Sequence, residues 1–201
     1  MFVAEVGGVE APDTAAARAA SGVCGEYAEV GLLNHSLRSY FWAAWIGDER
    51  GIGYDAELLY VAALLHDLAL TAPFDSHRLA FEEAGAQLAR VFAAGAGWAD
   101  ARRDRLAEII VLHMRDHVAA EVDPESHLLQ LAVSADVSGV GLDAFDPEFS
   151  AALLTAVPRA GFASAFLHAA RDQAERKPES AAGRLMPGGW AERIMGNPLD
   201  R

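Results

Sequence analysis

The stretch from Asp55 to Leu68 is apolar, has the period of a helix and ends in an adjacent histidine and aspartate, His66 and Asp67. Its apolar residues recur at i, i+3, i+4 and i+7, which places His66 at the end of an inward-facing stripe. A charged aspartate beside that stripe would be costly to bury without a partner. An imidazole nitrogen and a carboxylate oxygen together suit a divalent metal ion that also keeps water bound. A histidine that only caps the helix end is the alternative.

The rest of the chain also favours helices. Alanine and leucine dominate its apolar content, β-branched residues are sparse, and no segment alternates strictly between polar and apolar residues. We therefore predict an all-α bundle of about seven or eight helices, with Asn34 capping one helix and Asp55 another. Residues 1–11 are expected to form a loose arm, and the tail after Pro178 to be rich in loops. The predicted helices cover about 14–30, 34–46, 55–68, 76–93, 99–115, 125–138, 148–157 and 160–175.

The net charge limits the classes of partner that the protein could bind, and the cysteine content limits the kinds of site that it could contain. The formal net charge of −13 argues against binding to nucleic acid or to an anionic membrane surface, because both need a basic footprint. We expect a small-molecule substrate. A single cysteine, Cys24, excludes an internal disulfide and a thiolate zinc cluster. With no secretory leader pattern and no apolar run near the roughly 20 residues of a membrane span, the expected location is the cytoplasm. The oligomeric state is left open, a homo-oligomer included.

Two further residues make it more plausible that the His66-Asp67 pair binds a metal ion. His35 lies upstream in NHSLR, and Asp136 lies downstream in SADVSG, each on a predicted helix. Asp136 is the only acid in an apolar helical stretch, and metal ligation would explain its burial. Arg38 follows His35 by one helical turn and shares its face. It is predicted to lie near the metal, with an ordinary salt bridge as the alternative.

The remaining histidines divide into two groups. His77 follows His66 closely, and His113 ends the apolar run EIIVLH, so both are candidates to face the same cavity and bind substrate or a second metal. The other three, His117, His127 and His168, are expected at the surface.

Four segments resemble a known family. They are NHSLRSYFW, ELLYVAALLHDLALT, RLAFEEAGAQLA and the run from IIVLHM to LLQLAVSADVSG. Their order, H…HD…D, resembles the HD-domain superfamily of metal-dependent hydrolases, and in particular its cyanamide hydratase-like branch. This resemblance implies one HD domain over residues 1–201, with a core at about 28–142, C-terminal helices and a loop-rich tail. No family signature is recognised beyond about residue 145.

The same resemblance implies a set of site residues. It makes His35, His66, Asp67 and Asp136 the metal ligands and places Glu82 and His113 close by. The expected cofactor is a divalent ion, zinc first, with iron, manganese, nickel or cobalt as alternatives.

The implied activity is metal-assisted addition of water to a small substrate. Cyanamide or a related nitrile is the first candidate, in a pocket that Trp42, Trp45 and Phe81 would narrow. The alternative is hydrolysis of a small phosphate ester or nucleotide, with Arg38 or Arg78 neutralising the phosphate oxygens. A third hypothesis is a non-catalytic HD domain used for binding.

Proton transfer in either reaction is assigned to His77, Glu82 or His113.

Overall fold

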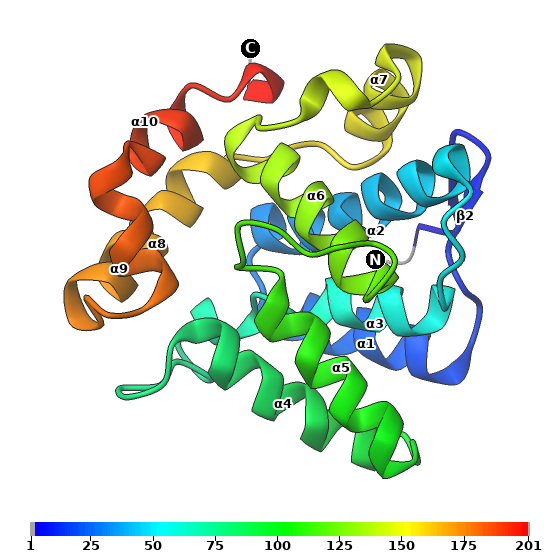
Figure 1. The fold of residues 1–201 in the computed structure, drawn as a ribbon, viewed down its shortest axis with the longest axis horizontal. Coiled ribbons are helices and arrows are strands. Elements are labelled where there is room, and N and C mark those ends of the chain that lie inside the picture. The colour runs from blue at the N-terminus through cyan, green and yellow to red at the C-terminus, as the bar shows by residue number, and fades with distance from the viewer. Residues whose placement is uncertain (1–2, 201) are drawn as a thin grey trace.

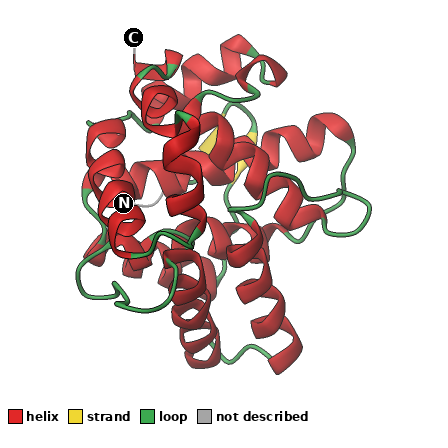
Figure 2. Ribbon diagram, turned by 60° about the vertical axis from the view of Figure 1, so that its left-hand side comes forward, coloured by secondary structure: helices red, strands yellow, loops and turns green. Residues whose placement is uncertain are grey.

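The computed structural model describes residues 3–200, and within that range most of the chain is helical and the strands are limited to one short hairpin, which confirms the all-α prediction (Figures 1 and 2). The helices are α1 (Ala15–Tyr27), α2 (Val30–Arg50), α3 (Ala56–Leu65), α4 (Phe81–Gly95), α5 (Asp100–Leu112), α6 (Pro124–Ser138), α7 (Pro147–Ala156), α8 (Phe162–Arg176), α9 (Ala181–Leu185) and α10 (Trp190–Met195). Single 3-10 turns are η1 (Leu68–Leu70), η2 (Leu142–Ala144), η3 (Met186–Gly188) and η4 (Pro198–Asp200). The described range thus holds more helices than predicted because the tail folds into α9 and α10.

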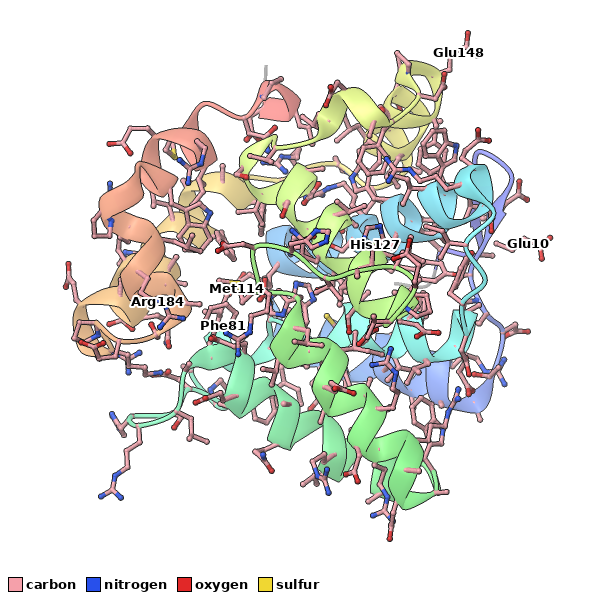
Figure 3. The ribbon with its side chains drawn as sticks, in the orientation of Figure 1. Glu10, Phe81, Met114, His127, Glu148 and Arg184 are labelled. Atoms are coloured by element: carbon pink, nitrogen blue, oxygen red, sulfur yellow. The ribbon has the colours of Figure 1, made fainter. Side chains whose placement is uncertain are left out.

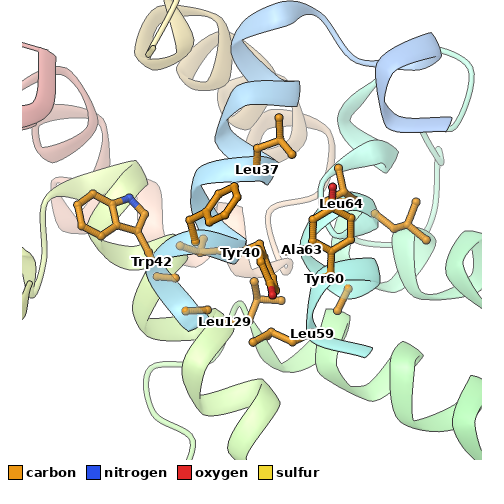
Figure 4. Packing of buried hydrophobic residues seen from close by; sticks show 14 of the residues in the cluster. Leu37, Tyr40, Trp42, Leu59, Tyr60, Ala63, Leu64 and Leu129 are labelled. Carbon is orange, nitrogen blue, oxygen red and sulfur yellow. The ribbon is translucent and has the colours of Figure 1, made fainter. Parts of the chain in front are cut away.

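Helix α3 lies at the centre of the packing. Every side chain from Leu58 to Leu65 is buried, and the helix contacts α1, α2, α4, α5 and α6. Figure 4 shows Leu59, Tyr60 and Leu64 of α3 beside Leu37 and Tyr40 of α2. An eight-residue apolar run has no polar face to present to solvent, so neighbours must cover it on all sides. The His66-Asp67 pair that follows this run is therefore delivered to the interior.

Local signals explain most helix boundaries. The carboxylate of Asp55 accepts a hydrogen bond from the Leu58 amide at 2.9 Å, which confirms the predicted cap. The predicted cap at Asn34 is wrong, because α2 already begins at Val30. Asn34 lies inside the helix, where its side-chain amide donates to the carbonyl of Pro158 at 2.7 Å. The position of an asparagine in the sequence does not show whether its side chain caps a helix or binds a loop far along the chain.

Two other predictions were wrong: the loose N-terminal arm and the start of the helix expected from residue 76. The N-terminal arm is not loose: β1 (Glu5–Val6) and β2 (Val9–Glu10) form an antiparallel hairpin that buries both valines. Gly7 and Gly8 have positive φ angles of 56° and 86°, which a tight turn of this kind requires. Helix α4 begins at Phe81 rather than near residue 76, because Asp75 is held by side chains of α8 and the adjoining Lys177.

The C-terminal helices complete the surroundings of α2 and α6. Helix α8 contacts α2, and α10 contacts both α6 and α8. These contacts bury Phe162, Phe166 and Trp190. In the described part of the chain, we find no helix that combines the length and the apolar character needed to cross a membrane.

Helices α3 and α4 approach so closely that only glycine fits between them. A β-carbon at Gly85 would lie 2.9 Å from the carbonyl oxygen of His66. Gly85→Ala is therefore expected to destabilise the fold by about 1–3 kcal/mol through overpacking, although alanine normally stabilises a helix interior by about 0.5–1 kcal/mol. Chemical denaturation measures the change.

Gly95, at the other end of α4, is the matched control. A β-carbon there would meet no described atom within 4 Å. Gly95→Ala is expected to be neutral or slightly stabilising. Equal effects of the two substitutions would contradict the close approach at Gly85.

Candidate metal centre

Three potential ligand atoms meet where α2 passes the end of α3. His35 is in the interior of α2, His66 is the C-terminal cap of α3, and Asp67 follows it before η1. The Nε2 atoms of His35 and His66 are 3.2 Å apart. Oδ2 of Asp67 lies 3.4 Å from Nε2 of His35 and 3.3 Å from Nε2 of His66. All three side chains are buried, and together they form a group able to hold a metal ion.

Hydrogen bonds fix which ring nitrogen of each histidine carries a proton. Nδ1 of His35 donates to Oδ2 of Asp136 at 2.6 Å, and Nδ1 of His66 donates to the carbonyl of Ala63 at 2.8 Å. A neutral imidazole that donates through Nδ1 keeps a bare lone pair on Nε2. Burial lowers the pKa of His35, but the carboxylates of Asp136 and Asp67 raise it overall, so a metal ion would take the place of a proton on Nε2. Two such lone pairs and the carboxylate of Asp67 would then face one ion.

The spacing of the three atoms also fits a metal ion. Two donor atoms that each lie about 2.1 Å from one ion are about 3.4 Å apart at a tetrahedral angle and about 3.0 Å apart at a right angle. The separations of 3.2, 3.3 and 3.4 Å lie between these values. Within residues 3–200 neither carboxylate oxygen of Asp67 has a hydrogen-bond partner, although both are buried. Unpaired buried oxygens of this kind are expected where a cation binds.

The neighbouring charges keep Asp67 ionised. Burial alone would raise the pKa of its carboxyl group, but positive charge on the imidazoles of His66 and His35 holds that pKa below its usual range, and a bound cation would supply the same positive charge once those protons leave. A carboxylate is the form that ligates metal.

Asp136, the fourth predicted ligand, lies on the other side of the His35 ring. Its Oδ2 accepts from Nδ1 of His35, whereas the group of clustered ligand atoms faces Nε2. Arg38 donates two hydrogen bonds to the same carboxylate, from Nε at 2.7 Å and from Nη2 at 2.8 Å. Burial opposes ionisation of Asp136, but Arg38 and then His35 keep the pKa of this carboxyl group below its usual range.

Arg38 is placed differently from the predicted substrate contact. The side chain is fully buried, and its remaining nitrogen, Nη1, donates to the carbonyls of Val157 and Pro158 at 3.3 and 3.0 Å. The salt bridge held open as an alternative is the arrangement observed. Sequence spacing located Arg38 beside His35 correctly, but the guanidinium faces Asp136 and the loop after α7.

The loop after α7 and the last turn of the described chain brace this arrangement. Nη1 of Arg159 and Nδ2 of Asn197 both donate to the backbone carbonyl of Asp136. Arg159 also binds Asp200 at 2.7 Å. The ring of Phe162 stacks on His35, with centroids 4.3 Å apart and planes 12° from parallel. These contacts leave His35 little freedom to turn.

His113 lies next to the clustered ligand atoms, whereas Glu82 lines the adjoining cavity and is near enough to Asp67 for the two charges to interact. Nε2 of His113 is 3.8 Å from Oδ1 of Asp67 and has no hydrogen-bond partner among the described residues. Burial, reinforced by the nearby His66, lowers the pKa of His113 to about 3, so its ring is neutral. Oε2 of Glu82 is likewise buried without a partner in the described chain, and burial raises the pKa of its carboxyl group.

A cavity of about 230 Å³ opens from this cluster. Asp67 and His113 contribute to its lining, and Phe166 and Trp190 are among its aromatic walls. Sequence reasoning missed both aromatic residues, because they lie beyond the recognised segments. The i, i+4 spacing of Phe162 and Phe166 was the available signal. Trp42 and Trp45, predicted to narrow the pocket, instead pack against Phe145 and Phe149 in the core. The third residue, Phe81, packs on the His113 ring at a centroid distance of 5.9 Å.

A second cavity, of about 540 Å³, adjoins the first and shares Met114 and Arg115 with it. Figure 3 shows Phe81, Met114 and Arg184 close together in this region. His77 and Arg78 line this cavity and are exposed, so the structure does not bring them to the clustered ligand atoms. Its basic lining residues are Arg78, Arg115, Arg176, Lys177 and Arg184.

Comparison with known proteins agrees with this architecture. Residues 32–137 match the HD domain family, and this range covers just over half of the chain. The chain therefore belongs to the HD-domain family, whose members bind divalent metal ions, and it is an enzyme of that superfamily. Two cyanamide hydratases of Saccharomyces cerevisiae, DDI2 and DDI3, are each 30% identical to it over 152 residues. The alignment covers 73% of this chain and 67% of each relative, which confirms the resemblance to that branch.

Proposed function

We propose that the protein adds water to a small nitrile, with cyanamide as the first candidate and urea as the product. The observation that carries this proposal is the lining of the 230 Å³ cavity, in which the carboxylate of Asp67 and the neutral imidazole of His113 lie beside hydrophobic side chains such as Val133, Phe166 and Trp190. Arg38, the cation closest in sequence to a ligand, is committed to Asp136. A small, uncharged, linear substrate needs no cationic clamp. The names of the two yeast relatives support the same substrate.

The proposed metal is zinc. Two imidazole nitrogens and one carboxylate oxygen form a donor set that zinc enzymes use, with further positions left for water and substrate. Iron, manganese, nickel and cobalt accept the same ligands and are the alternatives. The bound ion would supply acidified water and polarise the nitrile.

The chain's own residues supply orientation and proton transfer. Nε2 of His113 is a bare acceptor, since Nδ1 of that ring donates to the carbonyl of Ile110. It is therefore able to accept a hydrogen bond from water or from the substrate's amino group. Glu82, whose pKa burial raises, lines the adjoining cavity of about 540 Å³ and is the candidate to return a proton to the nitrile nitrogen. The rings of Phe166 and Trp190 form part of the cavity wall.

The second candidate function, hydrolysis of a small phosphate ester, is favoured by one observation. Arg115 and Arg193 line the cavity beside Asp67, and both are exposed. Together with Arg78 and Arg184 of the adjoining cavity, they form no ion pair with a described carboxylate. An anionic substrate would meet these side chains first.

Assays with cyanamide and with a generic phosphomonoester separate the two functions. The zinc-loaded protein is expected to form urea from cyanamide at kcat/KM of about 10⁴ M⁻¹s⁻¹ or more, the lower end of the usual enzyme range. Loss of the imidazole in His113→Ala is expected to lower this value by roughly 10²–10⁴-fold. His168→Ala, an exposed substitution, is the control. Comparable turnover of the phosphomonoester that falls in Arg115→Ala, with no urea formed, would overturn the proposal.

A further inference from the structure

We propose that Gln130 binds an N–H group of the substrate, so that the cavity beside Asp67 selects cyanamides that carry hydrogen on their amino nitrogen over nitriles that carry none. Ser134 is the positioning residue that orients the Gln130 amide. This inference rests on the proposed function and refines its substrate class. Neither residue is among the site residues predicted from the sequence.

Helix α6 contributes a row of uncharged polar side chains to the wall of this cavity. Gln130, Ser134 and Ser138 lie at i, i+4 and i+8, so they share one face of the helix, and all three line the cavity. Asp67 and His113 line the same cavity. Its volume of about 230 Å³ is below the roughly 300–1,000 Å³ of most ligand pockets. A substrate in so small a space contacts several walls at once.

Gln130 is the buried member of this row. The residue is only 8% exposed, and Nε2 of its amide donates to Oγ of Ser134 at 3.0 Å. Among residues 3–200 we find no donor for the other polar atom of the amide, Oε1. An amide oxygen at this depth needs a hydrogen-bond partner, because an unsatisfied one is costly to bury. Since Gln130 lines the cavity, a bound substrate can supply that partner.

The hydrogen bond to Ser134 decides which end of the amide meets the substrate. An amide has a donor end and an acceptor end, and Oγ of Ser134 holds the donor end. The acceptor end, Oε1, is left for the substrate. An acceptor matches the amino group of cyanamide, whereas alkyl nitriles and dialkylcyanamides have no N–H to donate. Nε2 of His113, a second bare acceptor on this cavity, is then free to bind the other N–H or water.

The charged side chains that also line this cavity are less suited to this role. Arg115 and Arg193 are donors only, so neither can accept from an amino group. Asp116 can accept, but it is exposed. Discrimination is strongest where a buried polar group would be left without a partner by the wrong substrate, and Gln130 meets that condition.

Cyanamide and N,N-dimethylcyanamide, assayed with the zinc-loaded, full-length protein, test the proposal. Gln130→Met approximately keeps the side-chain volume and removes the amide. Its kcat/KM for cyanamide is expected to fall roughly 10–100-fold. The fall should come mainly from a higher KM, because the lost hydrogen bond forms in the bound substrate as well as in the transition state. For dimethylcyanamide kcat/KM should change little, and the metal content should stay at the wild-type level.

Each variant is compared with the wild type on the same substrate, so differences in the size and reactivity of the two substrates cancel. Gln87→Met is the matched control, since Gln87 is exposed on α4 and lines neither cavity. It should keep the wild-type kcat/KM for both substrates. Ser134→Ala is expected to lower kcat/KM for cyanamide alone, by a smaller factor than Gln130→Met, because the amide loses the contact that orients it.

Two results for Gln130→Met would overturn the inference while leaving the proposed function in place. Equal losses on both substrates would show that Gln130 has a structural role only. Urea formation at the wild-type kcat/KM would show that the amide does not bind the substrate. A wild type that forms no urea from cyanamide would instead reject the proposed function, and this inference with it.

Discussion

Asp67→Ala is expected to abolish metal binding. The substitution removes a ligand and, with it, the negative charge that compensates a divalent cation at a fully buried position. The two imidazoles that remain are neutral donors. Protein purified without chelator should carry close to one ion per chain in the wild type and almost none in the variant, as measured by elemental analysis.

His127→Ala is the control for this result. His127, labelled in Figure 3, is half-buried on α6, and its Nδ1 donates to the carbonyl of Val118 at 2.7 Å. It is not one of the clustered ligand residues. Its loss should leave the metal content unchanged. A stoichiometric ion retained by Asp67→Ala would remove the basis for placing the metal at this cluster.

Arg38→Ala is expected to lower the free energy of unfolding by about 3–5 kcal/mol, because it leaves the buried Asp136 carboxylate without its counter-charge. For a chain of this size that corresponds to a fall in Tm of roughly 6–20 °C. Arg38→Lys keeps the charge but not the two parallel hydrogen bonds. Its free energy of unfolding should therefore lie between those of the wild type and Arg38→Ala. Chemical and thermal denaturation measure both.

Arg18→Ala, at the exposed pair with Asp13, is the matched arginine control and should change stability little. If Arg38→Ala instead kept wild-type stability and selectively lost activity on a phosphate ester, Arg38 would contact substrate as the sequence first suggested.

The sequence alone predicted the class of fold because its strongest signals are local. Helix α3 combines an eight-residue apolar run with a capping carboxylate at Asp55, and both act within a few residues. Asn34 and the N-terminal hairpin were mispredicted because their partners lie elsewhere. The side chain of Asn34 binds a carbonyl 124 residues away, and β1 is covered by α7.

The sequence predicted which residues lie near one another at the candidate site better than it predicted how their side chains are oriented. The potential ligand atoms of His35, His66 and Asp67 lie close together in the structure, as the resemblance implied. Spacing along a helix says that Arg38 and Asp136 are near His35, but not which ring nitrogen a carboxylate meets. That choice is made by long-range contacts, above all those of Arg38 with the loop after α7.

The bracing of Asp136 by Arg159 and Asn197 has a consequence for how the protein matures. The residues that match the HD domain end at 137, yet the carbonyl of Asp136 and the guanidinium of Arg38 are held by residues 157–197. During synthesis the ligands leave the ribosome well before these braces exist. We therefore expect the orientation of Asp136 and Arg38 to become fixed only after translation has passed Asn197. A fragment cut at the HD boundaries would carry the ligands without the support that orients them.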